Sequence, residues 1–155
     1  MKYRGLLNPF IMDSLAARIS ALDIQFLTSL MAFVPALFNI GIIFYILFKL
    51  PRNKTTDIFT FFVLAMVIWQ LEDSALRLPI SMASAQVSDG ILCIGGFAMA
   101  PLLLHFTLRF VHLEKFYSRS TLWIVYTPFV FFYILYMTNL HGMEYLHDKT
   151  WGWSN

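Results

Sequence analysis

The chain has little charge and one cysteine, and both shortages narrow the class of protein. Only 13% of its 155 residues are charged, whereas 59% are hydrophobic and the mean hydropathy is +0.67. Soluble domains of ordinary composition carry about 25% charged residues. A single cysteine, Cys93, excludes an intrachain disulfide and any CxxC metal or redox site. The composition therefore indicates a membrane protein.

Motifs of common enzymes are also missing. The sequence contains no Gly-rich phosphate loop, no HExxH pair and no GxSxG serine elbow. A b-type haem would need histidines at one depth on two helices, but His141 and His147 lie on the opposite side of the predicted membrane from His105. We therefore expect no enzymatic activity from this chain alone, no cofactor and no metal. The net charge of +2 implies no nucleic-acid partner.

Long apolar segments are what the chain has in abundance. A helix needs about 20 apolar residues to cross ~30 Å of hydrocarbon, and within lipid its backbone groups must bond inside the segment. The segments that meet this length run from about 26–50, 58–78, 90–111 and 122–140. We predict an all-α fold in which residues 1–155 form one integral membrane domain, an up-down bundle of about four transmembrane helices.

Both ends of the chain are predicted to lie at the outer membrane surface. Four apolar residues fall on one side of a helical wheel: Ile11, Leu15, Ile19 and Leu22. This pattern is typical of a short interfacial helix within residues 1–25, with a disordered tail as the alternative. Residues 141–155 mix charges with Tyr145, Trp151 and Trp153, a composition typical of an outer loop or tail.

Basic residues predict the orientation. The turns after the first and third segments carry several of them: Lys49, Arg52, Lys54, Lys115 and Arg119. Short basic turns remain in the cytoplasm, so both termini are expected outside. The predicted location is the inner (plasma) membrane, as a multi-pass protein.

Charged residues gather late in the second segment. Each charge inside a span costs roughly 2.5 to 3.5 kcal/mol on insertion scales, so each requires an explanation. Asp73 and Arg77 are four residues apart and can pair on one helix face, which leaves Glu72 pointing elsewhere. Glu72 is then either a ligand-contacting or proton-sensing carboxylate that opens to an outer cavity, or part of a helix end wetted by headgroups.

Prolines and small residues mark the helices that are expected to bend or to approach closely. Pro35, Pro101 and Pro128 lie inside predicted helices and tend to kink them. Kinked helices often frame a pocket, although irregular packing explains them equally well. Gly96 and Ala100, with Gly95 adjacent, favour close helix contact. In the third segment, His105, Arg109 and His112 form a polar stripe that is typical of headgroup anchoring.

Several of these features resemble the N-terminal seven-helix sensor region of bacterial histidine kinases, diguanylate cyclases and related signalling proteins. The resemblance covers about Leu30 to Trp153 and rests on three stretches: Trp69-Gln-Leu-Glu72, the run from Phe97 through Pro101 to Phe110, and Trp151-Gly-Trp153. Only the first four helices of that region are represented. We therefore expect the chain to be a truncated N-terminal part of such a receptor.

The resemblance implies signal reception. A ligand or membrane condition would shift helix packing, and a cytoplasmic effector would respond. The ligand or sensing candidates are Trp69, Glu72, Asp73, Arg77, Pro101 and His105. Expected partners are the lipid bilayer and a small-molecule or lipid ligand, with a homodimer or a membrane partner also open. The alternatives are a small transporter or channel subunit that uses Glu72, and a structural subunit of a membrane complex.

Overall fold

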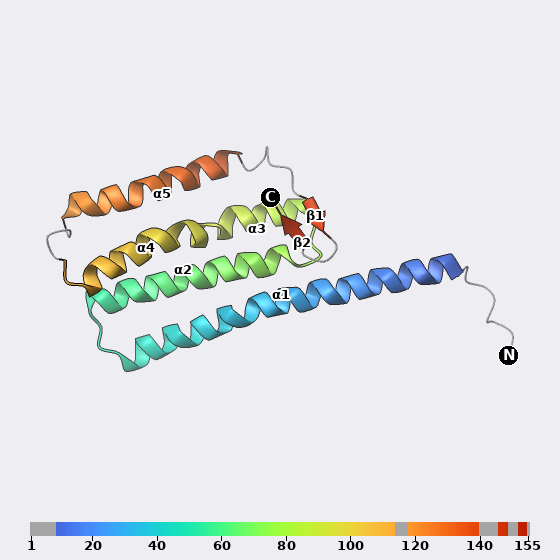
Figure 1. Ribbon diagram of the computed structural model, residues 1–155, viewed down its shortest axis with the longest axis horizontal. Helices are drawn as coiled ribbons and strands as arrows, with labels where there is room; N and C mark the ends of the chain where they lie inside the picture. Colours follow the sequence, from blue (N-terminus) through green and yellow to red (C-terminus); the bar gives the residue numbers. More distant parts are fainter. Residues whose placement is uncertain (1–8, 114–117, 140–145, 149–151, 155) are drawn as a thin grey trace.

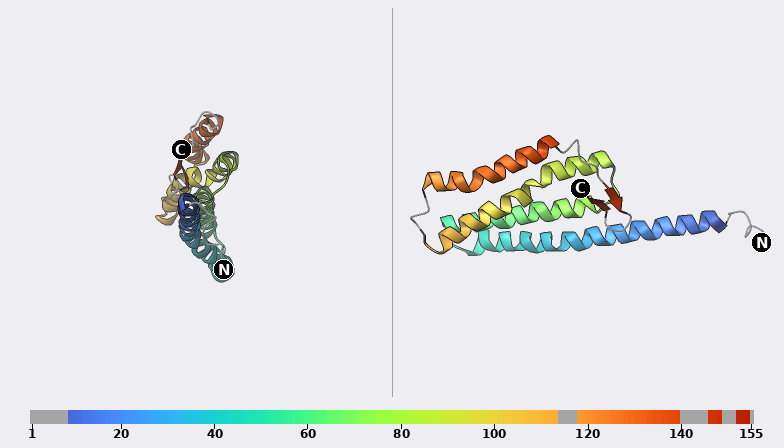
Figure 2. Two further views of the ribbon diagram at one scale, coloured as in Figure 1. Left: turned by 90° about the vertical axis from the view of Figure 1, so that its right-hand side faces the viewer. Right: turned by 45° about the horizontal axis from the view of Figure 1, so that its top comes forward.

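The computed structural model describes residues 9–113, 118–139, 146–148 and 152–154. Its helices are α1 (Pro9–Lys49), α2 (Lys54–Leu76), α3 (Met82–Leu92), α4 (Ile94–Phe110) and α5 (Arg119–Asn139). They lie side by side along one long axis and reverse direction at each turn, except that α4 continues the course of α3 (Figures 1 and 2). Within the described ranges, four stretches are long and apolar enough to cross a membrane: 23–49, 54–76, 82–110 and 120–139. The predicted all-α, multi-pass membrane bundle is confirmed.

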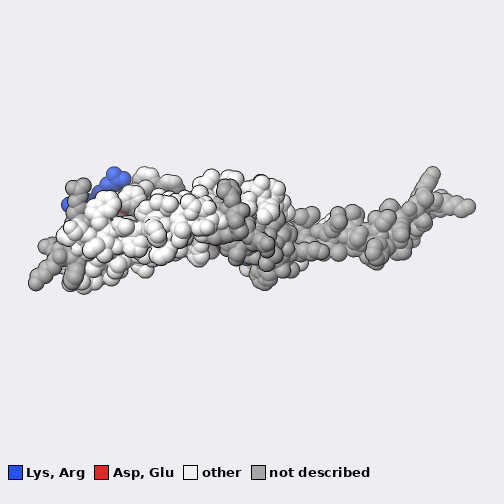
Figure 3. Space-filling view, turned by 90° about the horizontal axis from the view of Figure 1, so that it is seen from above, with Lys and Arg blue, Asp and Glu red and all other residues white. Residues whose placement is uncertain are grey.

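Small side chains occupy the helix contacts, and large ones face outward. α1 packs along α2, α2 along α4, and α4 along α5. The buried apolar residues include Ala36, Ala65 and Ala85, whereas Phe38 and Phe48 are 76% and 77% exposed. Lipid solvates large apolar side chains, so close packing of small residues is what holds such helices together. On the face seen in Figure 3, the described residues carry little charge, and most of the visible basic side chains lie at one end.

Polar contacts fix the register between α1 and α2. Ser29 Oγ donates to the carbonyl of Ser74 at 2.8 Å, and Ser74 Oγ donates to the carbonyl of Ser29 at 3.0 Å. Further along, Asn39 Nδ2 donates to Gln70 Oε1 at 3.0 Å. At the start of α2, the Asn53 side chain caps the helix by accepting from the backbone N–H of Thr56 at 2.8 Å.

α2 and α4 come into very close contact at Gly95. A Cβ on Gly95 would lie 2.6 Å from both the Ala65 carbonyl oxygen and the Trp69 backbone nitrogen. Small residues were expected to mediate close helix contact here, and they do, although Ala100 is exposed and takes no part in burying this contact. The absence of a side chain at Gly95 therefore sets the distance between the two helix backbones.

The structure corrects the predicted N-terminal helix. Residues from Pro9 onward are helical, but they continue into the first span as one helix of 41 residues and do not form a separate interfacial helix. No glycine or proline occurs between Pro9 and Pro35, so nothing in the sequence ends the helix there. The side chains of Ile11 and Leu15, which support the interfacial prediction, lie outside the described residues.

The third span also differs from its prediction. It begins at Met82, where Ser81 caps α3, and not at Gly90. Cys93 separates α3 from α4, although the backbone bonds Cys93 N to Asp89 O and Phe97 N to Cys93 O continue the helical course. At its other end α4 stops at Phe110, and His112 adopts a left-handed φ of 55°. His112 therefore lies beyond the end of the helix and is not part of the predicted polar stripe.

The predicted C-terminal loop or tail contains regular structure. β1 (Leu146–Asp148) and β2 (Gly152–Ser154) pair antiparallel, with His147 opposite Trp153. The predicted surface residues Tyr145 and Trp151 lie outside the described residues, as does Lys115 of the basic turn.

Candidate functional site

A cavity of about 480 Å³ opens between α2, α3, α4 and α5. Five aromatic side chains line it: Trp69, Phe97, Phe129, Phe132 and Tyr136. Phe97 packs against both Tyr133 and Tyr136 of α5, with ring centroids 5.8 and 5.6 Å apart. The cavity thus has an aromatic wall that comes mainly from α4 and α5.

Two acidic side chains meet in this apolar setting. Glu72 of α2 is 8% exposed and Asp89 of α3 is 1% exposed, and both line the cavity. Two carboxyl groups placed together in an apolar cavity favour a positively charged occupant.

One carboxyl oxygen of this pair has no partner. Glu72 Oε2 is buried, and no group in the described part of the chain is within hydrogen-bond reach of it. A buried acceptor left without a donor destabilises a protein by about 1 to 3 kcal/mol. An unsatisfied acceptor that borders a cavity is therefore a place where an incoming donor would gain a strong hydrogen bond.

Tyrosines of α5 attach that helix to α3 beside the acidic pair. Tyr136 Oη donates to Asp89 Oδ2 at 2.6 Å, and Tyr133 Oη donates to the Gly90 carbonyl at 3.3 Å. These bonds join residues 47 and 43 positions apart in the chain. The position of α5 is consequently coupled to the state of Asp89.

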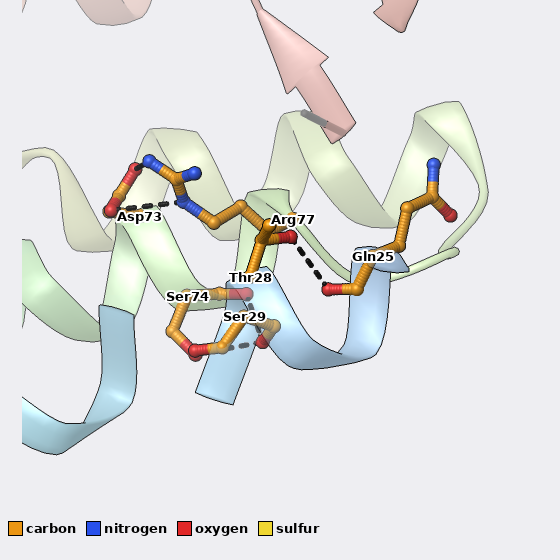
Figure 4. Close-up of polar contacts among 6 residues, drawn as sticks. All are labelled: Gln25, Thr28, Ser29, Asp73, Ser74 and Arg77. Atoms are coloured by element: carbon orange, nitrogen blue, oxygen red, sulfur yellow. Dashed lines mark hydrogen bonds and ion pairs between the residues drawn. The ribbon is translucent and has the colours of Figure 1, made fainter. Parts of the chain in front are cut away.

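The predicted ion pair next to Glu72 is present, and it lies outside the cavity lining. Arg77 Nη2 and Nε donate to the two carboxylate oxygens of Asp73 at 2.9 and 3.1 Å (Figure 4). The Asp73 side chain is 45% exposed. Arg77 is therefore engaged by its neighbour, and Glu72 points elsewhere, as expected from their spacing.

The remaining candidates are distributed over three places. Trp69 lines the cavity together with Glu72. Pro101 is buried and borders a separate apolar pocket of about 220 Å³ between α4 and α5. His105 lies farther along α4, where its Nδ1 is 3.0 Å from Tyr126 Oη. The structure thus brings two of the six candidates to the cavity, and it adds Asp89, Cys93 and Tyr136, which sequence reasoning missed.

Asp89 was missed because it was assigned to an outer loop. It is the only Asp, Glu, Lys or Arg between Arg77 and Arg109. A single acid in so long an uncharged stretch is the signal that could have identified it as an intramembrane group. Tyr136 gave no such signal, because tyrosines are common in apolar helices.

The described ranges, 9–113 and the shorter ones after it, contain no metal site that could be recognised from its ligands. In these ranges no three or more side chains of His, Cys, Asp or Glu come together in a group that could hold a metal ion.

Comparison with known proteins finds no matching family model, no similar curated protein and no similar solved structure.

Proposed function

We propose that the chain is the signal-reception domain of a membrane receptor, in which a small ligand occupies the cavity between α2 and α5. One observation carries the proposal: Asp89 belongs at once to the acidic pair in the cavity and to the bond that attaches α5. A ligand that engages this pair changes the hydrogen bond between Tyr136 and Asp89. It therefore stabilises one packing of α5 over another. Differential affinity for two such packings is what ligand sensing requires.

The same proposal assigns the orientation of the chain. Lys49, Arg52 and Lys54 lie at the turn between α1 and α2, at the same end of the bundle as the turn between α4 and α5. We place these turns in the cytoplasm, with both termini outside. A movement of α5 would then reach a cytoplasmic effector through the turn that precedes Arg119. The resemblance to receptor sensor regions supports this reading.

The lone cysteine permits a test that needs no knowledge of the ligand. Cys93 lines the cavity, so benzyl methanethiosulfonate would place a small aromatic group inside it. In nanodiscs, we expect the labelled protein to show altered hydrogen exchange in α5 and the preceding turn, relative to protein labelled with the methyl reagent. Exchange in the exposed turn after Lys49 should not change. A Cys93→Ala variant treated in the same way provides the blank.

Two results would contradict the receptor proposal. The first is a thiol that never reacts, because the cavity would then be closed to small molecules. The second is a benzyl-labelled protein in which α5 exchanges at the same rate as in the methyl-labelled protein, because the cavity would then be uncoupled from helix packing.

A transporter or channel subunit is the second candidate, and the acidic pair favours it. Ionisable groups inside a membrane commonly serve as relays for protons or substrates. In liposomes with an imposed pH gradient, a coupling carboxylate would give a proton flux that Glu72→Gln abolishes. The receptor proposal expects wild-type and Glu72→Gln liposomes to match empty ones.

A further inference from the structure

We propose that the cavity binds a small primary ammonium that carries an apolar or aromatic body, with its N–H groups donating to Glu72 Oε2. This deepens the receptor proposal by naming the chemical class of the ligand, and it rests on ligand reception at the same cavity. Charge, shape and hydrogen bonding each contribute to the inference.

The charged groups that line the cavity are acidic. Among the residues that the structure describes, its lining contains Glu72 and Asp89 but no lysine or arginine. Burying a carboxylate away from water is highly unfavourable, and a cation bound beside it lowers that cost. The nearby Arg77 does not provide this cation, because both Asp73 oxygens hold its guanidinium.

The aromatic wall suits the body of such a cation. Rings of Trp69, Phe97, Phe129, Phe132 and Tyr136 border the cavity. Aromatic faces attract ammonium groups, most strongly where water is excluded, and they also pack against a ring or alkyl chain. The volume of about 480 Å³ lies within the range of roughly 300 to 1,000 Å³ that is typical of small-molecule pockets.

The unpartnered oxygen selects a hydrogen-bonding cation. Glu72 Oε2 is a buried acceptor with no donor within reach among the described residues. A primary ammonium supplies both a positive charge and three N–H donors, and bonds of this charge-assisted kind are about twice as strong as neutral ones. A quaternary ammonium has no N–H, and an alcohol donates but carries no charge.

An ammonium of this kind can come from a free amine or from an ethanolamine lipid headgroup. The chemistry at Glu72 is the same, so competition has to separate the two sources. The probe is radiolabelled phenethylammonium, measured by equilibrium dialysis against the full chain in dodecyl maltoside, with empty micelles as the blank. The competitors are phenethyl alcohol, hydrocinnamate and short-chain phosphatidylethanolamine.

We expect saturable binding of phenethylammonium that hydrocinnamate does not displace and that phenethyl alcohol displaces at least about tenfold less well than the unlabelled amine. Glu72→Gln keeps the shape of the side chain but removes its charge, and should weaken binding by about tenfold or more. Asp57→Asn is the matched control, because it removes an exposed carboxylate from the first turn of the same helix, away from the cavity, and it should bind within about twofold of wild type. Each variant is first checked for helical circular dichroism and a monodisperse elution peak.

Absence of saturable binding to folded wild-type protein would overturn the inference, as would equal binding to folded Glu72→Gln. If phenethyl alcohol competed as well as the amine, the ligand class would be wrong while the cavity and the receptor proposal remained. Displacement by phosphatidylethanolamine would support the ammonium site and assign its occupant to lipid. Its failure to displace would support a free amine. The Cys93 labelling test involves no ammonium, so it reports on the receptor proposal separately.

Discussion

Two serines show how single residues join helices in this protein. Ser29 and Ser74 are 5% and 8% exposed, and each hydroxyl donates to the other residue's carbonyl (Figure 4). A serine hydroxyl in lipid has few alternative partners, so such bonds favour helix association by about 0.6 kcal/mol on average and up to ~1.7. The pair lies one residue from Asp73, so it also holds α1 against the charged end of α2.

Removing either serine hydroxyl should therefore weaken the bundle. We expect Ser29→Ala and Ser74→Ala each to lower the free energy of unfolding by about 0.6 to 1.7 kcal/mol, measured by denaturant titration in mixed micelles. Ser120→Ala is the control, because Ser120 is exposed on α5, and its effect should stay within about 0.5 kcal/mol. A loss at Ser120 equal to that at Ser29 would show that the interhelical bonds contribute nothing.

At the scale of elements, the contact between α2 and α4 positions the cavity. Trp69 and Glu72 extend from α2, while Cys93, Gly96 and Phe97 follow the end of α3. The backbones come close at Gly95, which lies between Cys93 and Gly96 in this stretch. Because the two nearest neighbours of a Cβ on Gly95 are backbone atoms, they cannot move aside as the end of a side chain would.

A methyl group at Gly95 should consequently separate the helices. We expect Gly95→Ala to lower the free energy of unfolding by about 1 to 3 kcal/mol, as overpacked contacts do. Gly41→Ala is the matched control in α1, because nothing lies within 4 Å of a Cβ there. Alanine favours helix over glycine by up to about 1 kcal/mol, so Gly41→Ala should be neutral or stabilising. The same destabilisation at both glycines would refute the close-approach explanation.

At the scale of the whole molecule, α1 is too long to lie within the membrane. Its 41 residues correspond to about 62 Å of helix, against ~30 Å of hydrocarbon. Figure 1 shows its first half extending past the ends of α2 and α3. The first part of α1 therefore projects beyond the bundle, on the side away from the turn between α1 and α2.

The proposed orientation can be tested by thiol labelling of intact cells. In a Cys93→Ala background, we expect Ala83→Cys, at the start of α3, to react with a membrane-impermeant maleimide, since that end is placed outside. Asn53→Cys and Ser118→Cys, in the basic turns, should react only after the cells are permeabilised. All three sites are exposed. The opposite labelling pattern would invert the orientation and remove the proposed route to a cytoplasmic effector.

Much of the fold could be predicted because bilayer physics acts on single segments. The four spans follow from apolar length alone, and the pairing of Asp73 with Arg77 follows from helical spacing. The start of the third span was missed because Ser81, Ser84, Gln86, Ser88 and Asp89 make its first turns polar. These residues cap or belong to α3, which packs against α2 and α4. Their polar composition is typical of a loop in water, so it does not reveal that they are part of a membrane-spanning stretch.

The sequence by itself determined that the chain spans a membrane, how many times, and that Glu72 points away from the pair formed by Asp73 and Arg77, because each of these depends on the content or spacing of one segment. Only the tertiary structure decided that Glu72 meets Asp89 and that Tyr136 joins them, since these residues come from three helices and their distance depends on how backbones pack. The contact at Gly95 illustrates the reason: a glycine is visible in any sequence, but which backbone fills the space beside it is a property of the assembled bundle.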